Sequence, residues 1–194
     1  LNHVELVYRP GERALATRVF ELFGFKVRDR GGPWVFAYID PVLSDTSNNA
    51  FYASEMTSEQ WALEQELAAA VADGAGTSLA AAASGYLAKL RRDPQFSMHF
   101  GIRYRERADF DAALDRLRAA DDDPELKGRI GLSAVFEPDA PGAIATNMTQ
   151  AFIHTDVIGS GLLVRSFWGL RRSSMVSDSE PGARPRAGPP AGNY

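Results

Sequence analysis

The sequence of 194 residues contains no cysteine and only three histidines. The absence of cysteine excludes disulfide scaffolds, thiol nucleophiles and iron–sulfur clusters. The chain also lacks an excess of positive charge, since its formal net charge is −4 and its pI is about 5.4. That balance argues against a nucleic-acid partner. No apolar run approaches the roughly 18 residues that span a bilayer. We therefore expect a cytoplasmic protein with no membrane partner.

Hydrophobic residues make up 45% of the chain and charged residues 24%, which is typical of a chain with a packed core. Apolar alternation predicts strands, and apolar spacing of three to four predicts helices. The resulting order, β-α-β-β-β, occurs twice and predicts an α+β fold. In the first copy the strands are expected at 1–9, 25–28, 34–39 and 51–56, with a helix at 12–23. In the second copy they are expected at 96–104, 131–136, 149–157 and 161–168, with a helix at 108–117.

Two segments differ from the repeated units. Residues 57–95 are predicted to form a pair of helices, the first opened by a capping box in Thr57-Ser58-Glu59-Gln60. Their thin apolar stripe favours packing on the sheets or on a second subunit. In Pro181–Tyr194, half of the 14 residues are Pro or Gly, which predicts a disordered tail. The predicted divisions are a first unit at 1–56, a helical insertion at 57–95, a second unit at 96–172 and a tail at 173–194.

Two of the three histidines occupy the same place in the repeat. His3 lies in the first strand of one unit, and His99, 96 residues later, lies in the first strand of the other. If the units are related by a pseudo-twofold axis, both imidazoles can face one cavity and bind a transition metal. An oxygen ligand is then expected on the last strand of each unit. Glu55 supplies it in the first unit, whereas the corresponding residue of the second unit is Arg165. Two histidines and one carboxylate leave open positions, as in a catalytic metal site.

The segment His3-Val4-Glu5-Leu6, followed by a helix that ends in Phe23-Gly24-Phe25, resembles the glyoxalase/bleomycin-resistance/extradiol-dioxygenase superfamily, which has the vicinal oxygen chelate fold. The doubled element order and His99 strengthen the resemblance, which covers about 1–56 and 96–170 and makes 57–95 an insertion. It implies one half-open, eight-stranded cup. It also implies a divalent metal held at four positions, here His3, Glu55, His99 and Arg165. Arg165 departs from the family pattern, which usually has a carboxylate there.

Arg165 leaves two alternatives open, because a guanidinium does not ligate metal. In the first alternative Arg165 pairs with Glu55 and the ion pair replaces the metal. In the second, Arg165 binds an anionic substrate beside a metal with three protein ligands. Other residues are predicted to line the cup. Glu5, Arg103 and Phe167 are candidate substrate contacts. His154 is a candidate proton carrier, because imidazole titrates near neutrality.

The first functional hypothesis is a glyoxalase-like or dioxygenase-like enzyme acting on a small molecule with paired oxygens. His3, Glu55 and His99 would hold Fe, Mn, Ni or Zn, and the reaction would be that of a lyase, isomerase or dioxygenase. The alternative is a metal-free cup that binds a small aromatic or anionic ligand, as resistance members of the superfamily do by sequestration. A third hypothesis is a catalytically silent fold whose insertion and tail bind other proteins. A homodimer is expected from the resemblance alone.

Overall fold

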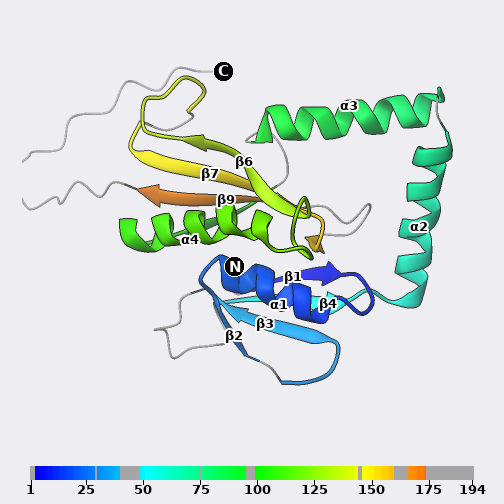
Figure 1. Ribbon diagram of the computed structural model, residues 1–194, viewed down its shortest axis with the longest axis horizontal. Coiled ribbons are helices and arrows are strands. Elements are labelled where there is room, and N and C mark those ends of the chain that lie inside the picture. The colour runs from blue at the N-terminus through cyan, green and yellow to red at the C-terminus, as the bar shows by residue number, and fades with distance from the viewer. Residues whose placement is uncertain are drawn as a thin grey trace, which may run out of the picture.

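The structure is a computed structural model that describes residues 3–28, 30–39, 49–74, 76–94, 99–143, 146–159 and 166–173, with the backbone alone for residues 91 and 166–173. It confirms a mixed α+β fold, in which two β-sheets each pack against a helix (Figure 1). No helix in the described ranges is long and apolar enough to cross a membrane. The elements in chain order are β1 (His3–Tyr8), α1 (Arg13–Leu22), β2 (Lys26–Arg28), β3 (Trp34–Tyr38), β4 (Ala50–Glu55), α2 (Ser58–Asp73), α3 (Ser78–Arg92), β5 (His99–Arg103), α4 (Arg107–Ala119), the short 3-10 helix η2 (Ala120–Asp122), β6 (Ile130–Phe136), β7 (Met148–Thr155), β8 (Ile158–Gly159) and β9 (Ser166–Ser173).

The predicted repeat of element order extends to the strand pairing. The first sheet has the order β2-β3-β4-β1-β8 and the second the order β5-β9-β7-β6. In each unit the first strand pairs in parallel with the last, as β1 does with β4 and β5 with β9. The remaining pairs within each unit are antiparallel. The two units therefore share one topology, since β6, β7 and β9 correspond to β2, β3 and β4.

The helix of the first unit ends as its sequence predicts. Gly24 adopts a φ of +81°, a conformation that a glycine tolerates best. The Phe25 N–H donates to the Phe20 carbonyl at 3.2 Å, which closes the last turn of α1. Arg116 of α4 lies beside this turn and donates from Nε to the Leu22 carbonyl at 2.9 Å. The end of α1 is thus held by its own backbone and by the second unit.

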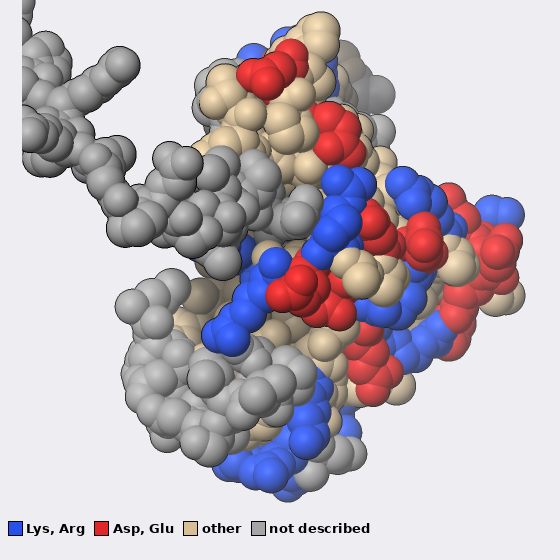
Figure 2. Space-filling view, turned by 90° about the vertical axis from the view of Figure 1, so that its left-hand side faces the viewer, with Lys and Arg blue, Asp and Glu red and all other residues tan. Residues whose placement is uncertain are grey.

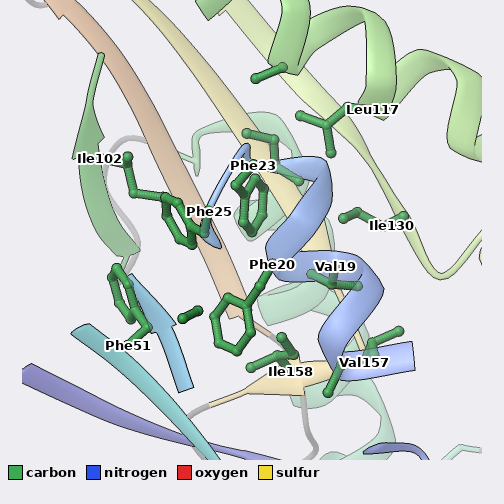
Figure 3. Close-up of a cluster of buried hydrophobic side chains, with 14 of the residues drawn as sticks. Val19, Phe20, Phe23, Phe25, Phe51, Ile102, Leu117, Ile130, Val157 and Ile158 are labelled. Carbon is green, nitrogen blue, oxygen red and sulfur yellow. The ribbon is translucent and has the colours of Figure 1, made fainter. Parts of the chain in front are cut away.

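One core joins the two units (Figure 3). Phe20 and Phe23 of α1 are fully buried, and Phe51 of β4 lies among them. The Phe51 ring also meets Phe100 of β5, with a centroid separation of 6.1 Å. Each fully buried Phe is worth about 1.5–3 kcal/mol of transfer free energy. The strand β8 adds Ile158, which is fully buried, to this core and pairs with the edge of β1.

An ion-pair network reinforces the same junction. Arg129, just before β6, donates to both carboxylate oxygens of Glu12 at 2.9 and 2.8 Å and to Asp156 at 2.9 Å. Asp156 also accepts from Arg9 at 3.0 Å. These hydrogen bonds and ion pairs raise the pKa of Arg129, with the Glu12 bond as the largest cause. Residues from both units are therefore fixed around one guanidinium.

The last strand is predicted at 161–168, and the described strand β9 spans Ser166–Ser173, which confirms the prediction for residues 166–168 and extends the strand to residue 173. The run Gly161-Leu162-Leu163-Val164 is continuously apolar, so alternation does not fix its register. The structure fixes it by pairing, because Phe167 stands opposite both His99 of β5 and His154 of β7. Residues 160–165, and with them Arg165, lie outside the described residues, as does the predicted tail from residue 174 onward.

Candidate functional site

Strand alternation gives the first sheet two chemically different faces. Leu6, Val35 and Phe51 point toward α1 and are buried in the core. Paired residues point to the same side of a sheet, so the register of β1, β3 and β4 identifies the side chains on the opposite side. We call this side the far face of the first sheet. Its members are His3, Glu5, Val7, Trp34, Phe36, Tyr38, Ala50, Tyr52 and Ser54.

Aromatic rings form a row across this far face. The Tyr52 ring lies 5.2 Å from the His3 ring and 5.1 Å from the Phe36 ring, centroid to centroid. The Phe36 and Tyr52 rings meet edge to face, a favourable arrangement for aromatic pairs. Trp34, on the same face, leaves 48% of its surface exposed. The row therefore presents flat apolar surface on the side of the sheet that α1 does not cover.

Charged groups border the aromatic row. The Arg30 guanidinium lies 5.1 Å from the centre of the Phe36 ring, and its Nη2 donates to the Tyr38 hydroxyl at 3.3 Å. Arg28 lies 5.9 Å from the centre of the Tyr38 ring. At the other side of the row, Glu5 accepts a short hydrogen bond from the Ser54 hydroxyl. Figure 2 shows basic side chains gathered at the lower edge of the molecule, at the level where Figure 1 places β2 and β3.

The second sheet has a corresponding far face, opposite α4, with different contents. His99 meets the fully buried Phe152 ring edge to face at 5.3 Å. His154 shares a hydrogen bond with the Ser133 hydroxyl through Nδ1 at 3.0 Å. Gly131 makes room for that imidazole, because a Cβ there would lie 3.0 Å from His154 Cε1. The structure thus places His99 and His154 on one face, separated by the strand β9.

Glu55 does not join His3, contrary to the predicted metal site. Glu55 pairs with Tyr8 and His3 with Ala50, so the two residues lie at opposite ends of adjacent parallel strands. Five residues of strand separate them by roughly 16 Å. Odd spacing also puts them on opposite faces of the sheet. Glu55 accepts instead from the Gly11 N–H at 3.1 Å, and its charge adds to burial in raising the pKa of Tyr8.

The register of the two units also identifies a different counterpart of Glu55 in the second unit. His3 stands opposite Ala50 and His99 opposite Phe167, so Ala50 corresponds to Phe167 and Glu55 to Arg172. The predicted correspondence of Glu55 with Arg165 is therefore wrong, because the pairing of β9 assigns that position to Arg172. Among the residues that the structure describes, no three His, Asp or Glu side chains are close enough to hold a metal ion.

Arg103 lies at the end of β5, where it lines a cavity of about 420 Å³ between the two units. Phe25 and Ile102 form part of its apolar lining. Tyr104 and Arg116 also line it, and both already hydrogen-bond carbonyls of the last turn of α1. Burial raises the pKa of the Tyr104 phenol strongly, and the charge of Asp109 adds to this effect. The cavity therefore lies where the two units pack against each other. Glu5 does not line it.

The aromatic row was missed at the sequence level, although its signal was present. Trp34, Phe36 and Tyr38 alternate along one predicted strand, which places their rings on one face of the sheet. Alternation alone does not say which face of a strand meets the helix. A comparison with Val35 and Ala37, which are small and apolar, would have identified the core side.

The comparisons with known proteins give no relative for this chain: no family model, curated protein or solved structure matches it.

Proposed function

We propose that the protein binds a small aromatic anion, without a metal, on the far face of the first sheet. The two repeated units would form the two sides of a cup around this ligand, as in the vicinal oxygen chelate fold. The observation that supports the proposal most directly is the row His3–Tyr52–Phe36, beside the half-exposed Trp34. Small-molecule sites typically combine apolar and aromatic lining with a few polar groups that orient the ligand.

The charges beside the row favour an anionic ligand. Arg28 and Arg30 lie against rings of the same face, so a flat ligand stacked on the row would meet their guanidinium groups. A guanidinium binds a carboxylate through two parallel hydrogen bonds. Glu5 and the hydroxyl of Ser54 would contact the opposite end of the ligand and favour a hydrogen-bond donor there.

The metal-free alternative is preferred over the metal-dependent enzyme because of where Glu55 lies. Its carboxylate is about 16 Å along the strands from His3 and on the other face. Glu55 is therefore not placed to complete a metal site with His3 and His99. Binding rather than turnover is accordingly the activity to measure first.

The test is calorimetric titration of the purified, untagged chain with 1-naphthoate, a flat aromatic carboxylate. Wild type is expected to bind it, and Tyr52→Ala to raise the Kd about three- to tenfold, because one ring contact is lost. Arg30→Gln should weaken 1-naphthoate without weakening 1-naphthalenemethanol, its neutral counterpart. Tyr86→Ala, which removes a ring from α3 rather than from the first sheet, is the control and should leave the Kd unchanged.

Two results would overturn the proposal. One is 1-naphthoate binding that Tyr52→Ala leaves intact, or no binding at any concentration tested. The other is one equivalent of a transition metal retained by wild type and lost in His99→Ala, with ligand affinity abolished by a chelator. That second result would restore the metal-dependent enzyme.

A further inference from the structure

The helices α2 and α3 form an arm that stands apart from the sheets in Figure 1. Apart from each other, neither makes more than marginal contact with any described helix or strand. Both are well-formed helices, because the Thr57 hydroxyl accepts from the Gln60 N–H at 3.2 Å and the Thr77 hydroxyl from the Ala80 N–H at 3.3 Å. Two isolated helices of about four turns are marginal in water without packing of their apolar side chains.

The arm nevertheless exposes large apolar side chains. Leu63 of α2 is 53% exposed, and Leu79 and Tyr86 of α3 are 48% and 62% exposed. Among the described residues, only Trp34 and Val135 are other large hydrophobic residues exposed to this degree. The apolar surface is thus concentrated on the element with the least packing of its own.

On each helix these residues belong to a continuous exposed stripe. Spacings of three and four residues place side chains on one helix face. The α2 stripe consists of Glu59, Leu63, Glu66, Ala70 and Asp73, all exposed. The α3 stripe consists of Leu79, Ala82, Tyr86 and Lys89, all exposed.

The two helices also differ in the sign of their charge. The α2 segment Ser58–Asp73 contains four acidic residues and no basic one. The α3 segment Ser78–Arg92 contains three basic residues and no acidic one. Asp93, just after α3, pairs with Lys89 and Arg92 and leaves this end of the arm net positive. The acidic stripe begins at the start of α2, and the basic residues lie at the end of α3.

We propose that the arm pairs with the arm of a second copy of this chain, with α2 of each copy lying antiparallel on α3 of the other. In this register Glu59 meets the Lys89–Arg92 end of the partner helix, Leu63 meets Tyr86, and Ala70 meets Leu79. The contact occurs twice, as in an isologous dimer with twofold symmetry. Opposite charges and antiparallel helix dipoles both favour it.

The arm itself indicates why the partner is a second copy. A surface that contains both an acidic stripe and a basic stripe is complementary to itself after a twofold rotation. Leu63 lies between Glu59 and Glu66 on the α2 stripe, and Tyr86 lies one turn before Lys89 on the α3 stripe, so the same rotation also covers Leu63 and Tyr86. A partner of uniform charge would match only one of the two helices.

The first experiment measures mass in solution by light scattering across a range of protein concentrations. Wild type is expected to form a dimer. Leu63→Ser and Tyr86→Ser should each raise the dimer Kd at least tenfold. Val135→Ser, at an exposed apolar residue of β6, is the matched control and should leave the dimer unchanged. Circular dichroism verifies that each variant keeps its helices.

The second experiment tests the pairing of α2 with α3 specifically. Glu59→Lys with Glu66→Lys makes both contacts of a homodimer repulsive, and so does Lys89→Glu with Arg92→Glu. Each double variant alone should be a monomer. An equimolar mixture should form a heterodimer, because the altered α2 then faces the altered α3 and the two unaltered helices face each other.

A wild-type chain that stays monomeric at all concentrations overturns the proposal. So does a dimer that the arm variants leave intact, or a mixture of the two charge variants that fails to recover the dimer. Binding of 1-naphthoate by the wild-type chain is a separate readout, so this proposal and the proposed function can fail independently.

Discussion

The two repeated units have the same strand pairing, and each has a tyrosine at the same position. Tyr8 ends the first strand of one unit, and Tyr104, 96 residues later, follows the first strand of the other. Each hydroxyl donates to a backbone carbonyl at 2.7 Å, Tyr8 to Pro33 of its own unit and Tyr104 to Phe23 of the other unit. The same repeat position thus stabilises one unit internally and, in the second, the junction between units.

The far faces of the two sheets differ more than their cores do. In the first sheet Glu5 stands opposite Tyr52. At the corresponding positions of the second sheet, Gly101 stands opposite Gly169. The core-facing residues are apolar in both units, as Leu6 and Phe100 illustrate. The two units thus share their strand pairing and an apolar core face, whereas the residues on their far faces differ.

The largest expected effect concerns the shared core. Phe20→Ala in α1 and Phe110→Ala in α4 should each lower the free energy of unfolding by about 3–5 kcal/mol, because both rings are fully buried. Each variant should still unfold in one transition, since both rings belong to one core. Urea unfolding followed by circular dichroism and by tryptophan fluorescence measures this. Two separated transitions would show that the units are independent.

A smaller effect is expected at the ion-pair network between the units. Arg129→Ala leaves the carboxylates of Glu12 and Asp156 facing each other, partly buried, and should cost about 2 kcal/mol of unfolding free energy. Arg107→Ala is the matched control. Arg107 pairs with Asp111 one turn away on the exposed surface of α4, and its loss should cost under about 0.5 kcal/mol. If Arg129→Ala and Arg107→Ala lower the free energy of unfolding equally, the ion-pair network has no special role in stability.

The smallest expected effect distinguishes the two repeated tyrosines. Burial raises the folded-state pKa of Tyr104 far above its unfolded value of about 10, and that of Tyr8 to a lesser extent. The neutral phenol is therefore favoured by folding. This contribution is fully present below about pH 10 and is lost as the pH rises further, because the unfolded chain ionises first.

Near neutral pH, Tyr104→Phe should cost about 1 kcal/mol, the typical value of one hydrogen bond. Above pH 10 its stability should fall less steeply than that of wild type, and the Tyr8→Phe variant should fall at a rate between the two. Urea unfolding at several pH values between 8 and 11 tests this. If the free energy of unfolding falls equally steeply with pH in all three chains, the ionisation of Tyr104 is not the main cause of the loss of stability at high pH.

Much of the fold could be predicted from periodicity and turn residues. The helix at 12–23 was predicted because Val19, Leu22 and Phe23 recur at helical spacing and Gly24 follows. The capping box at Thr57 was confirmed in part, by the bond from the Gln60 N–H to the Thr57 hydroxyl. The register of the last strand was not predicted, because Leu162, Leu163 and Val164 form an unbroken apolar run that has no alternation.

The candidate site was harder to predict because it depends on register. Glu55 ends a strand, as expected, and the parallel pairing of β1 with β4 determines that it faces away from His3. A shift of one residue in that pairing reverses the face to which every side chain points. Nothing in the local sequence near Glu55 specifies that shift.

The sequence by itself determined the doubled β-α-β-β-β order, the helical pair and its opposite charges, because these follow from local spacing and composition. Only the tertiary structure decided which face of each sheet meets its helix, in which register the last strand pairs, and that Tyr104 and Arg129 hold the units together. These features depend on contacts between residues far apart in the chain, and the free energy of such contacts is set by the packing of the whole molecule rather than by any one segment.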